Sequence, residues 1–250
     1  MNNFPAPQFY VDHYKVHSYE TDFKQRLSLS ALLNFMQETA GNHATSNGFG
    51  FSHLSSKGHF WVLSRAKVNV QRYPMWNEEL KLRTWSKIPD ALMAYRDFEL
   101  LDAQDNIIAT ANTVWLVVDI NTHRPVRMGE AFTLFPHVTD RNAITTAAKL
   151  GQVIATLQSP HTITLGEMDM NGHVNNGYYV RWALDSLPLV FAQQNEVCDL
   201  EVNFLHESCA GQQYAVGMQQ TADSSFSGSI VRQDDGKELI RIQVQTRPNP

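Results

Sequence analysis

Three polar residues in the second half of the chain have side chains suited to acyl-transfer chemistry. Asp169, Asn171 and His173 lie two residues apart in the run DMNGHVNN. In an extended segment such residues project to the same side, so their side chains can face one space. A carboxylate, a carboxamide and an imidazole can then serve as a base, an orienting donor and a proton donor.

The same run leads into a predicted helix over residues 176–187, with Asn175 or Asn176 as its N-cap. The first backbone amides of such a helix carry partial positive charge, so Asn176 and Gly177 are candidate donors to a developing oxyanion. These residue types are also common in strand-to-helix turns because they cap and turn the chain. Spacing alone favours that structural explanation.

The rest of the sequence predicts strands around two helices. A helix is expected over residues 30–45, with Leu33, Met36, Ala40 and His43 at helical spacing and Gly48 as a stop signal. β-branched and aromatic residues predict strands in both halves. The first half has predicted strands at 13–20, 59–73, 79–86, 93–101 and 107–119, and the second half at 161–165, 198–206, 213–221, 225–232 and 238–246.

An internal repeat connects the two halves. An offset of 147 residues lays 19–39 on 166–186 without a gap and places Asp22 opposite Asp169, and an offset of 134 aligns the later strands. The first copy has other residues where the second has its remaining polar groups: Lys24 for Asn171, Arg26 for His173 and Tyr73 for Glu207. The repeat therefore predicts one chemical site per chain, in the second half.

Composition limits the class of protein. The 250 residues are 43% hydrophobic and 18% charged with a net charge of -5, which allows a sizeable core and argues against nucleic-acid binding by global charge. Two cysteines, Cys198 and Cys209, form neither a disulfide framework nor a CxxC pair. The first residues do not read as a signal peptide and no apolar run reaches about 20 residues, so we expect a cytoplasmic protein.

The motifs resemble those of the acyl-ACP thioesterase family, which includes plant plastid enzymes and bacterial relatives. The resemblance covers roughly residues 8–247 and rests on DMNGHVNNGYYVRWALDSLP, HFWVLSRAKVNVQRYPMWNEELKLRTW, TANTVWLVVDINTHRPVR and LEVNFLHES. Asp169, Asn171 and His173 occupy the family's D-x-N-x-H positions, and Glu207 occupies its downstream acidic position. In plant members a cysteine follows that acid, whereas Ser208 follows it here, which argues against an obligatory cysteine nucleophile.

The resemblance implies an α+β fold of two tandem hotdog domains, each a curved antiparallel sheet around a long central helix. We expect an N-terminal hotdog at 1–128 that binds the acyl chain, a linker at 129–158 and a C-terminal hotdog at 159–250 with the catalytic residues. The implied reaction is hydrolysis of fatty acyl-ACP by water, without metal or cofactor. The candidate acyl-chain residues are Leu33, Met36, Ala40, Trp61 and Met93.

Two mechanisms stay open. Asp169 and Glu207 can act on one water as base and orienter, with Asn171 and His173 placing groups or supplying a proton, or Asp169 can attack the thioester directly. Acyl carrier protein is the expected partner, and a basic stretch from Arg65 to Lys87 could steer this acidic protein or could be a solvated strand face.

Other functions compete with this interpretation. An acyl-CoA thioesterase would share the fold and the chemistry. A hotdog dehydratase would need a proline after His43 and Gly48 that the sequence lacks. A non-catalytic acyl-binding protein is the alternative of another class. Monomer and homodimer are both compatible with a double hotdog.

Overall fold

The computed structural model describes residues 9–128 and 135–250, so the expected linker residues 129–134 and the first eight residues lie outside the description. The described chain forms two compact units. Unit 1 comprises residues 9–28, 34–64, 71–128 and 135–146, and unit 2 comprises 29–33, 65–70 and 147–250. Each unit is built from one half of the chain, apart from two short segments of the first half that group with unit 2.

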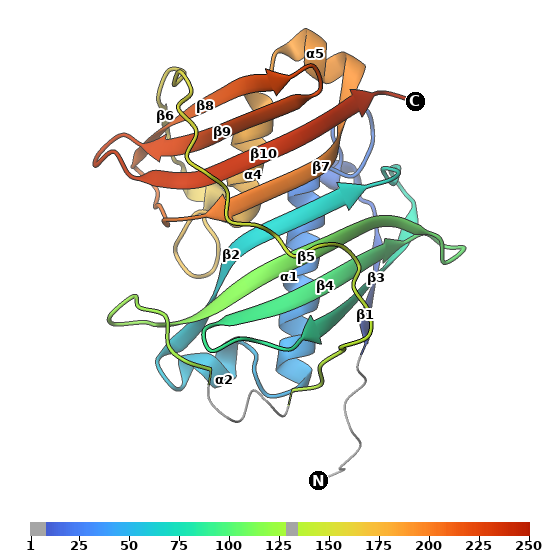
Figure 1. Cartoon of the computed structure of the whole chain (residues 1–250), viewed down its shortest axis with the longest axis vertical. Helices are drawn as coiled ribbons and strands as arrows, with labels where there is room; N and C mark the ends of the chain where they lie inside the picture. The colour runs from blue at the N-terminus through green and yellow to red at the C-terminus, as the bar shows by residue number, and fades with distance from the viewer. Residues whose placement is uncertain (1–8, 129–134) are drawn as a thin grey trace. The chain divides into compact units, whose positions relative to one another are not determined.

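Each half has one strand, a long helix and then four strands, as the sequence predicts (Figure 1). The first half contains β1 (Tyr10–Lys15), the 3-10 turn η1 (Ser18–Glu20), α1 (Leu29–Ser46), α2 (Phe51–Ser55), β2 (His59–Val70), β3 (Glu79–Lys87), β4 (Met93–Leu101) and β5 (Ile107–Asp119). The second half contains β6 (His161–Thr162), the 3-10 turn η2 (Leu165–Glu167), α4 (Asn176–Asp185), α5 (Leu189–Gln194), β7 (Asn195–Phe204), β8 (Gln213–Ala222), β9 (Ser225–Arg232) and β10 (Glu238–Pro248).

The two short helices were not predicted. Pro188 lies just after the end of α4, as expected. It also precedes α5, and this is possible because proline is well tolerated at a helix start. The first predicted strand, 13–20, is wrong at both ends: β1 begins at Tyr10, and residues 18–20 form η1. Among the described residues, none of the helices combines the length and apolar character needed to cross a membrane.

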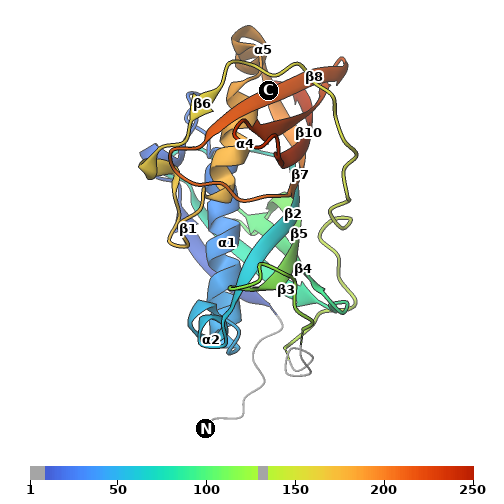
Figure 2. The ribbon, with the colours of Figure 1, turned by 90° about the vertical axis from the view of Figure 1, so that its left-hand side faces the viewer.

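In unit 1 the antiparallel strands run in the order β1-β3-β4-β5-β2, and α1 packs against one face of them (Figure 2). Met36 and Ala40 are buried on this helix, and Tyr14 of β1 donates a hydrogen bond to the Phe35 carbonyl at 3.2 Å. Full burial of a side chain of methionine size stabilises the fold by about 1.5–3 kcal/mol. The apolar stripe of α1 therefore fixes the helix on the sheet.

Unit 2 has the order β7-β10-β9-β8-β6, with residues 65–69 of β2 paired to β7. Its helix α4 buries Val180 and Ala183 completely. Trp182 of α4 stacks on Tyr214 of β8 with ring centroids 3.9 Å apart. This contact sets how α4 lies on the sheet and so where its N-terminal end stands.

Phe135, at the start of the described part of the expected linker, contacts His43 of α1, whereas residues 141–158 form an outer strap on the sheet faces opposite the helices (Figure 2). In unit 1 the buried carboxylate of Asp97 accepts hydrogen bonds from Asn112 Nδ2 at 2.6 Å and from the Ala143 amide at 3.0 Å. In unit 2 Asn203 accepts from the Leu150 amide at 2.8 Å and donates to the Ala148 carbonyl at 2.9 Å. Buried polar side chains on each sheet thus pair with the strap backbone.

We expect Asp97→Ala to lower the free energy of unfolding by about 2 kcal/mol, because it removes a buried carboxylate that accepts from the Ala143 amide of the strap and from Asn112 Nδ2. Urea unfolding measures the change. Asp140→Ala, just before the strap, is the matched control, since Asp140 is exposed and should change stability by less than about 0.5 kcal/mol. Equal stability of the two variants would contradict the role given to Asp97.

Candidate active site

A tight turn holds the predicted D-x-N-x-H residues. The Asp169 amide donates to the His173 carbonyl at 2.7 Å, and the Gly172 amide donates to the Asp169 carbonyl at 3.1 Å. Gly172 has φ +78°, a conformation in which a side chain would be strained. The expectation of an extended segment is therefore wrong. The three polar residues are grouped because the chain turns between them.

The carboxylate of Asp169 caps this turn. Its Oδ1 accepts hydrogen bonds from the backbone amides of Asn171 at 2.8 Å and His173 at 3.4 Å, and its Oδ2 lies 3.4 Å from Asn171 Nδ2. An aspartate that accepts from amides two and four residues on is a common way of closing a turn. Oδ1 therefore closes the turn, whereas Oδ2 accepts no backbone amide of this turn.

Glu207 joins the turn from the segment that follows β7. Its Oε2 lies 3.4 Å from His173 Nε2, and the side chains of His173 and Glu207 are 27% and 45% exposed. The Val174 amide donates to the Ser208 carbonyl at 2.9 Å, which ties the two segments together beside this contact. Such exposed pairs contribute little to stability, but solvent can reach both groups.

The segment around Glu207 is held by three residues that the sequence did not predict for the site. Arg232 Nη1 donates to the Glu207 carbonyl at 2.8 Å, and Asp235 holds the same guanidinium at 2.7 Å. The Tyr179 hydroxyl lies 2.6 Å from Ser208 Oγ, and burial raises the pKa of Tyr179 to about 12, so the phenol keeps its proton. Ser208 is buried, and the Tyr179 hydroxyl engages its Oγ.

The N-terminal end of α4 begins where the sequence predicts. Asn175 is the N-cap, and its Oδ1 accepts from the Gly177 amide at 2.8 Å. The Gly177 amide is thus engaged in the cap, which removes it from the predicted pair of oxyanion donors. Asn176 lies in the first helical turn, next to the segment that carries His173.

The first half of the chain contains the same turn at the predicted offset. The Asp22 amide donates to the Arg26 carbonyl at 2.7 Å, and Asp22 Oδ1 accepts from the amides of Lys24 at 2.8 Å and Arg26 at 3.0 Å. The Leu27 amide donates to the Pro74 carbonyl at 2.8 Å, as Val174 does to Ser208. The repeat inferred from sequence is therefore a repeat of backbone structure.

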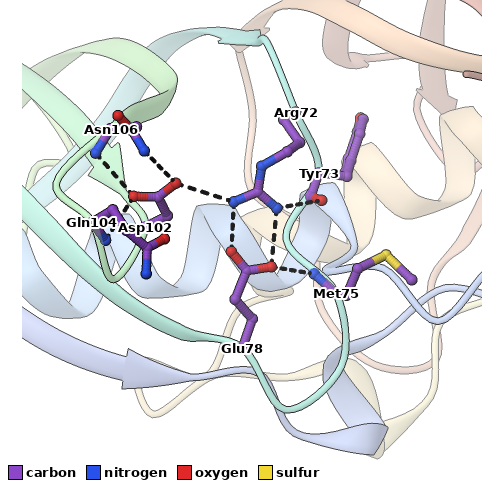
Figure 3. A network of polar contacts seen from close by, with 7 residues as sticks. All are labelled: Arg72, Tyr73, Met75, Glu78, Asp102, Gln104 and Asn106. Carbon is purple, nitrogen blue, oxygen red and sulfur yellow. Dashed lines mark hydrogen bonds and ion pairs between the residues drawn. The ribbon is translucent and has the colours of Figure 1, made fainter.

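The two copies of the turn have different side chains at the position of His173 and Glu207. Arg26 lies over the Tyr73 ring, 4.8 Å from its centroid, where the second copy has His173 beside Glu207. Figure 3 shows how the Tyr73 segment is held: Arg72 pairs with Glu78 at 2.6 Å and reaches the Tyr73 carbonyl at 3.5 Å. Asp102 lies 3.6 Å from the same guanidinium. This copy keeps the geometry without the imidazole–carboxylate pair.

The predicted acyl-chain residues are not all on one side of the sheet. Leu33, Met36 and Ala40 are buried on α1, and Trp61 of β2 packs against Ala94 and Phe135. Arg96 of β4 contacts His43 of α1. Side chains two residues apart on a strand point to the same side, so residues of β4 an even number of positions from Arg96 also face the helix. Met93 projects to the opposite face of β4. It therefore does not share the side of the sheet that α1 covers.

The basic stretch predicted to steer a carrier is paired with acidic residues of the chain itself. The Nζ–carboxylate or guanidinium–carboxylate distances are 3.8 Å for Lys67–Glu201, 2.7 Å for Lys81–Asp105, 3.1 Å for Arg83–Glu99 and 3.7 Å for Lys87–Asp97. Much of its positive charge is neutralised locally, which weakens the case for long-range steering by these residues.

Two family models match the chain. The acyl-ACP thioesterase N-terminal domain matches residues 7–134, and the acyl-ACP thioesterase C-terminal domain matches residues 152–247. The palmitoyl-acyl carrier protein thioesterase of Gossypium hirsutum chloroplasts is 27% identical over 96% of this chain and 64% of its own length. The acyl-[acyl-carrier-protein] hydrolase FATB1 of Cuphea viscosissima is 26% identical over 94% and 61%. The chain thus spans less than two thirds of these relatives.

Solved structures show the same fold. An acyl-ACP thioesterase from Bacteroides thetaiotaomicron superposes with a TM-score of 0.89 at 23% identity, covering 96% of this chain and 98% of that one. The 12:0-ACP thioesterase from Umbellularia californica gives 0.86 at 24% identity, covering 97% and 98%. The chain has the α+β tandem hotdog fold that the sequence predicts.

We expect Asp22→Ala and Asp169→Ala to lower the free energy of unfolding by similar amounts, about 1 kcal/mol each, because each carboxylate caps the same turn. Urea unfolding of both single variants and the double variant measures this, and the two losses should add. Asp234→Ala, at an exposed turn, is the control that should leave stability unchanged. A loss confined to one copy would contradict the structural equivalence of the turns.

Proposed function

The chain belongs to the acyl-ACP thioesterase family, and on that premise we propose that it hydrolyses the thioester of fatty acyl-ACP to a free fatty acid and the carrier. The observation that carries the proposal is the 3.4 Å contact between His173 and Glu207 beside the turn capped by Asp169. These residues occupy the family's D-x-N-x-H and downstream acidic positions. The reaction would draw acyl chains away from fatty-acid synthesis.

Water attack is the mechanism that the geometry favours. Glu207 is half exposed and lies against His173, so it is the carboxylate better placed to take a proton from water. Asp169 Oδ1 is occupied by two backbone amides, so Asp169 acts through Oδ2 as the group that orients the water. The hydroxide oxygen then bonds to the thioester carbonyl carbon, and the proton moves to Glu207.

Collapse of the tetrahedral intermediate breaks the carbon–sulfur bond. The pair Glu207–His173 returns a proton to the leaving sulfur, which leaves as the carrier thiol, while the acyl group leaves as a carboxylic acid. Asn171 in the tight turn and Asn176 in the first turn of α4 would donate to the oxyanion. No metal ion takes part in this scheme. The first half of the chain would hold the acyl chain with Leu33, Met36, Ala40 and Trp61.

We also propose the acyl carrier, the cellular location and the oligomeric state of the protein. The matched relatives bear names that specify acyl carrier protein, which favours this partner over coenzyme A. A cytoplasmic location is proposed from composition, whereas the plant relatives are chloroplast proteins. A monomer or a homodimer would serve equally, because a double hotdog already supplies two domains.

We expect purified protein to release fatty acid from a panel of octanoyl- to stearoyl-ACPs faster than from the matching acyl-CoAs. Asp169→Asn should lower kcat/KM about a hundredfold or more, because the amide keeps the turn but removes the carboxylate charge. Asp22→Asn is the matched control in the first copy and should leave release unchanged. Faster release from acyl-CoA would reassign the carrier, and release from neither would leave an acyl-binding protein as the better account.

Isotope transfer separates water attack from attack by Asp169. A single turnover in ¹⁸O water should put the label in the fatty acid and leave the Asp169 carboxylate unlabelled, because no mixed anhydride forms. Mass spectrometry of the peptide containing Asp169 measures this. Label in that carboxylate, or an acyl group trapped on it, would replace the water mechanism by the anhydride.

A further inference from the structure

A buried arginine lies inside unit 1, in the middle of β4. Arg96 is 8% exposed and its side chain points to α1, where Nη1 lies 2.8 Å from His43 Nδ1 and 3.2 Å from Thr84 Oγ1. His43 and Thr84 are fully buried. The proposed reaction uses none of these three residues.

The cluster has hydrogen-bond donors to spare and no spare acceptor. Burial lowers the pKa of His43 to about 3, so its imidazole is neutral. Because Arg96 donates to Nδ1, the imidazole proton is on Nε2, and Nε2 is buried with no hydrogen-bond partner in the described part of the chain. The Thr84 hydroxyl donates to the Asp97 carbonyl at 2.9 Å, so its oxygen accepts from Arg96.

The positive charge of Arg96 has no acidic partner within residues 9–128 and 135–250. Among the described residues no carboxylate forms an ion pair with it, and although burial lowers its pKa to about 10, it stays charged at neutral pH. A buried unpaired charge is costly, and an unsatisfied buried donor adds to the cost. The Phe135 ring, 5.9 Å from the guanidinium, offsets only part of it.

Apolar side chains surround this polar group. Tyr10 stacks on His43 at 5.3 Å, and Phe135 meets the His43 ring edge-on at 5.0 Å. Ala94 and Trp115 pair across β4 and β5 on the same face as Arg96. A small number of polar groups among apolar side chains is the usual composition of a small-molecule site.

The cluster stands at the end of the helix face assigned to the acyl chain. Met36, Ala40 and His43 follow one another at helical spacing on α1, over about 10 Å. We propose that Arg96 and His43 form a subsite for an oxygen acceptor at the distal end of the acyl chain, a carboxylate, carbonyl or hydroxyl. The proposal rests on the proposed function, since it assigns the substrate class of that reaction.

The hydrogen-bond donors of Arg96 and His43 predict an order of preference among these ligands. A carboxylate would supply the missing counter-charge of Arg96 and accept from His43 Nε2, and hydrogen bonds to charged groups are the stronger ones. A hydroxyl or carbonyl oxygen would accept from the same donors without neutralising the charge. A plain methyl end would leave the donors unpaired. The chain is thus expected to prefer acyl groups with an oxygenated end.

The test compares acyl-ACPs of equal length with a methyl, an ω-hydroxy and an ω-carboxy end. We expect the wild-type protein to hydrolyse the oxygenated substrates with kcat/KM about tenfold higher or more, mainly through KM. Arg96→Met and His43→Phe should abolish the preference while the methyl-ended substrates are still hydrolysed. Arg141→Met, an arginine of the outer strap, should keep the preference. Melting temperatures establish that each variant is folded.

The outcomes separate this inference from the function on which it rests. Hydrolysis of methyl-ended acyl-ACP by the wild-type protein with no preference for oxygenated ends overturns the subsite and leaves the function standing. If no acyl-ACP is hydrolysed, the function fails, and calorimetric binding of free ω-hydroxy and dicarboxylic fatty acids decides the subsite by itself. Equal binding of these and plain fatty acids overturns it, whereas tighter binding lost in Arg96→Met supports it.

Discussion

A turn closed by one carboxylate is the interaction on which the candidate site depends. In each half of the chain an aspartate, Asp22 or Asp169, accepts from two backbone amides just before the central helix. The residue after the turn then donates to the segment that follows a strand, at Pro74 or Ser208. The turn therefore aligns three things at once: the start of the helix, the polar side chains of the turn, and the residue that faces them.

Much of this arrangement follows from local sequence patterns. Apolar periodicity predicts α1 within one residue at each end, and β4, β5 and β9 at their observed bounds. The offset of 147 residues predicts that Asp22 and Asp169 are equivalent, and the hydrogen bonds bear this out. The extended interpretation of residues 169–173 is wrong, because Gly172 at φ +78° allows a turn that side-chain alternation cannot indicate.

The parts that sequence could not supply are contacts between distant segments. Arg232 holds Glu207 from a strand end 25 residues away, and Tyr179 meets Ser208 across 29. Neither pair has a periodicity or a motif that would relate its members. The same holds for Arg96 and His43, which are separated by 53 residues and look like an ordinary strand residue and an ordinary helix residue until the fold brings them together. Short-range patterns predict elements, and the fold alone decides which side chains meet.

The duplicated turn has a consequence for recognising active members among similar sequences. Asp22 accepts from the two backbone amides equivalent to those that bond Asp169, although Arg26 and Tyr73 lie beside it in place of an imidazole and a carboxylate, so the acid serves the turn whether or not that pair is present. Aspartate at this position is thus a poor marker of catalysis. The imidazole and the carboxylate that faces it occur together in the second copy and are replaced in the first by Arg26 and Tyr73, so their joint presence is the feature that distinguishes the two copies.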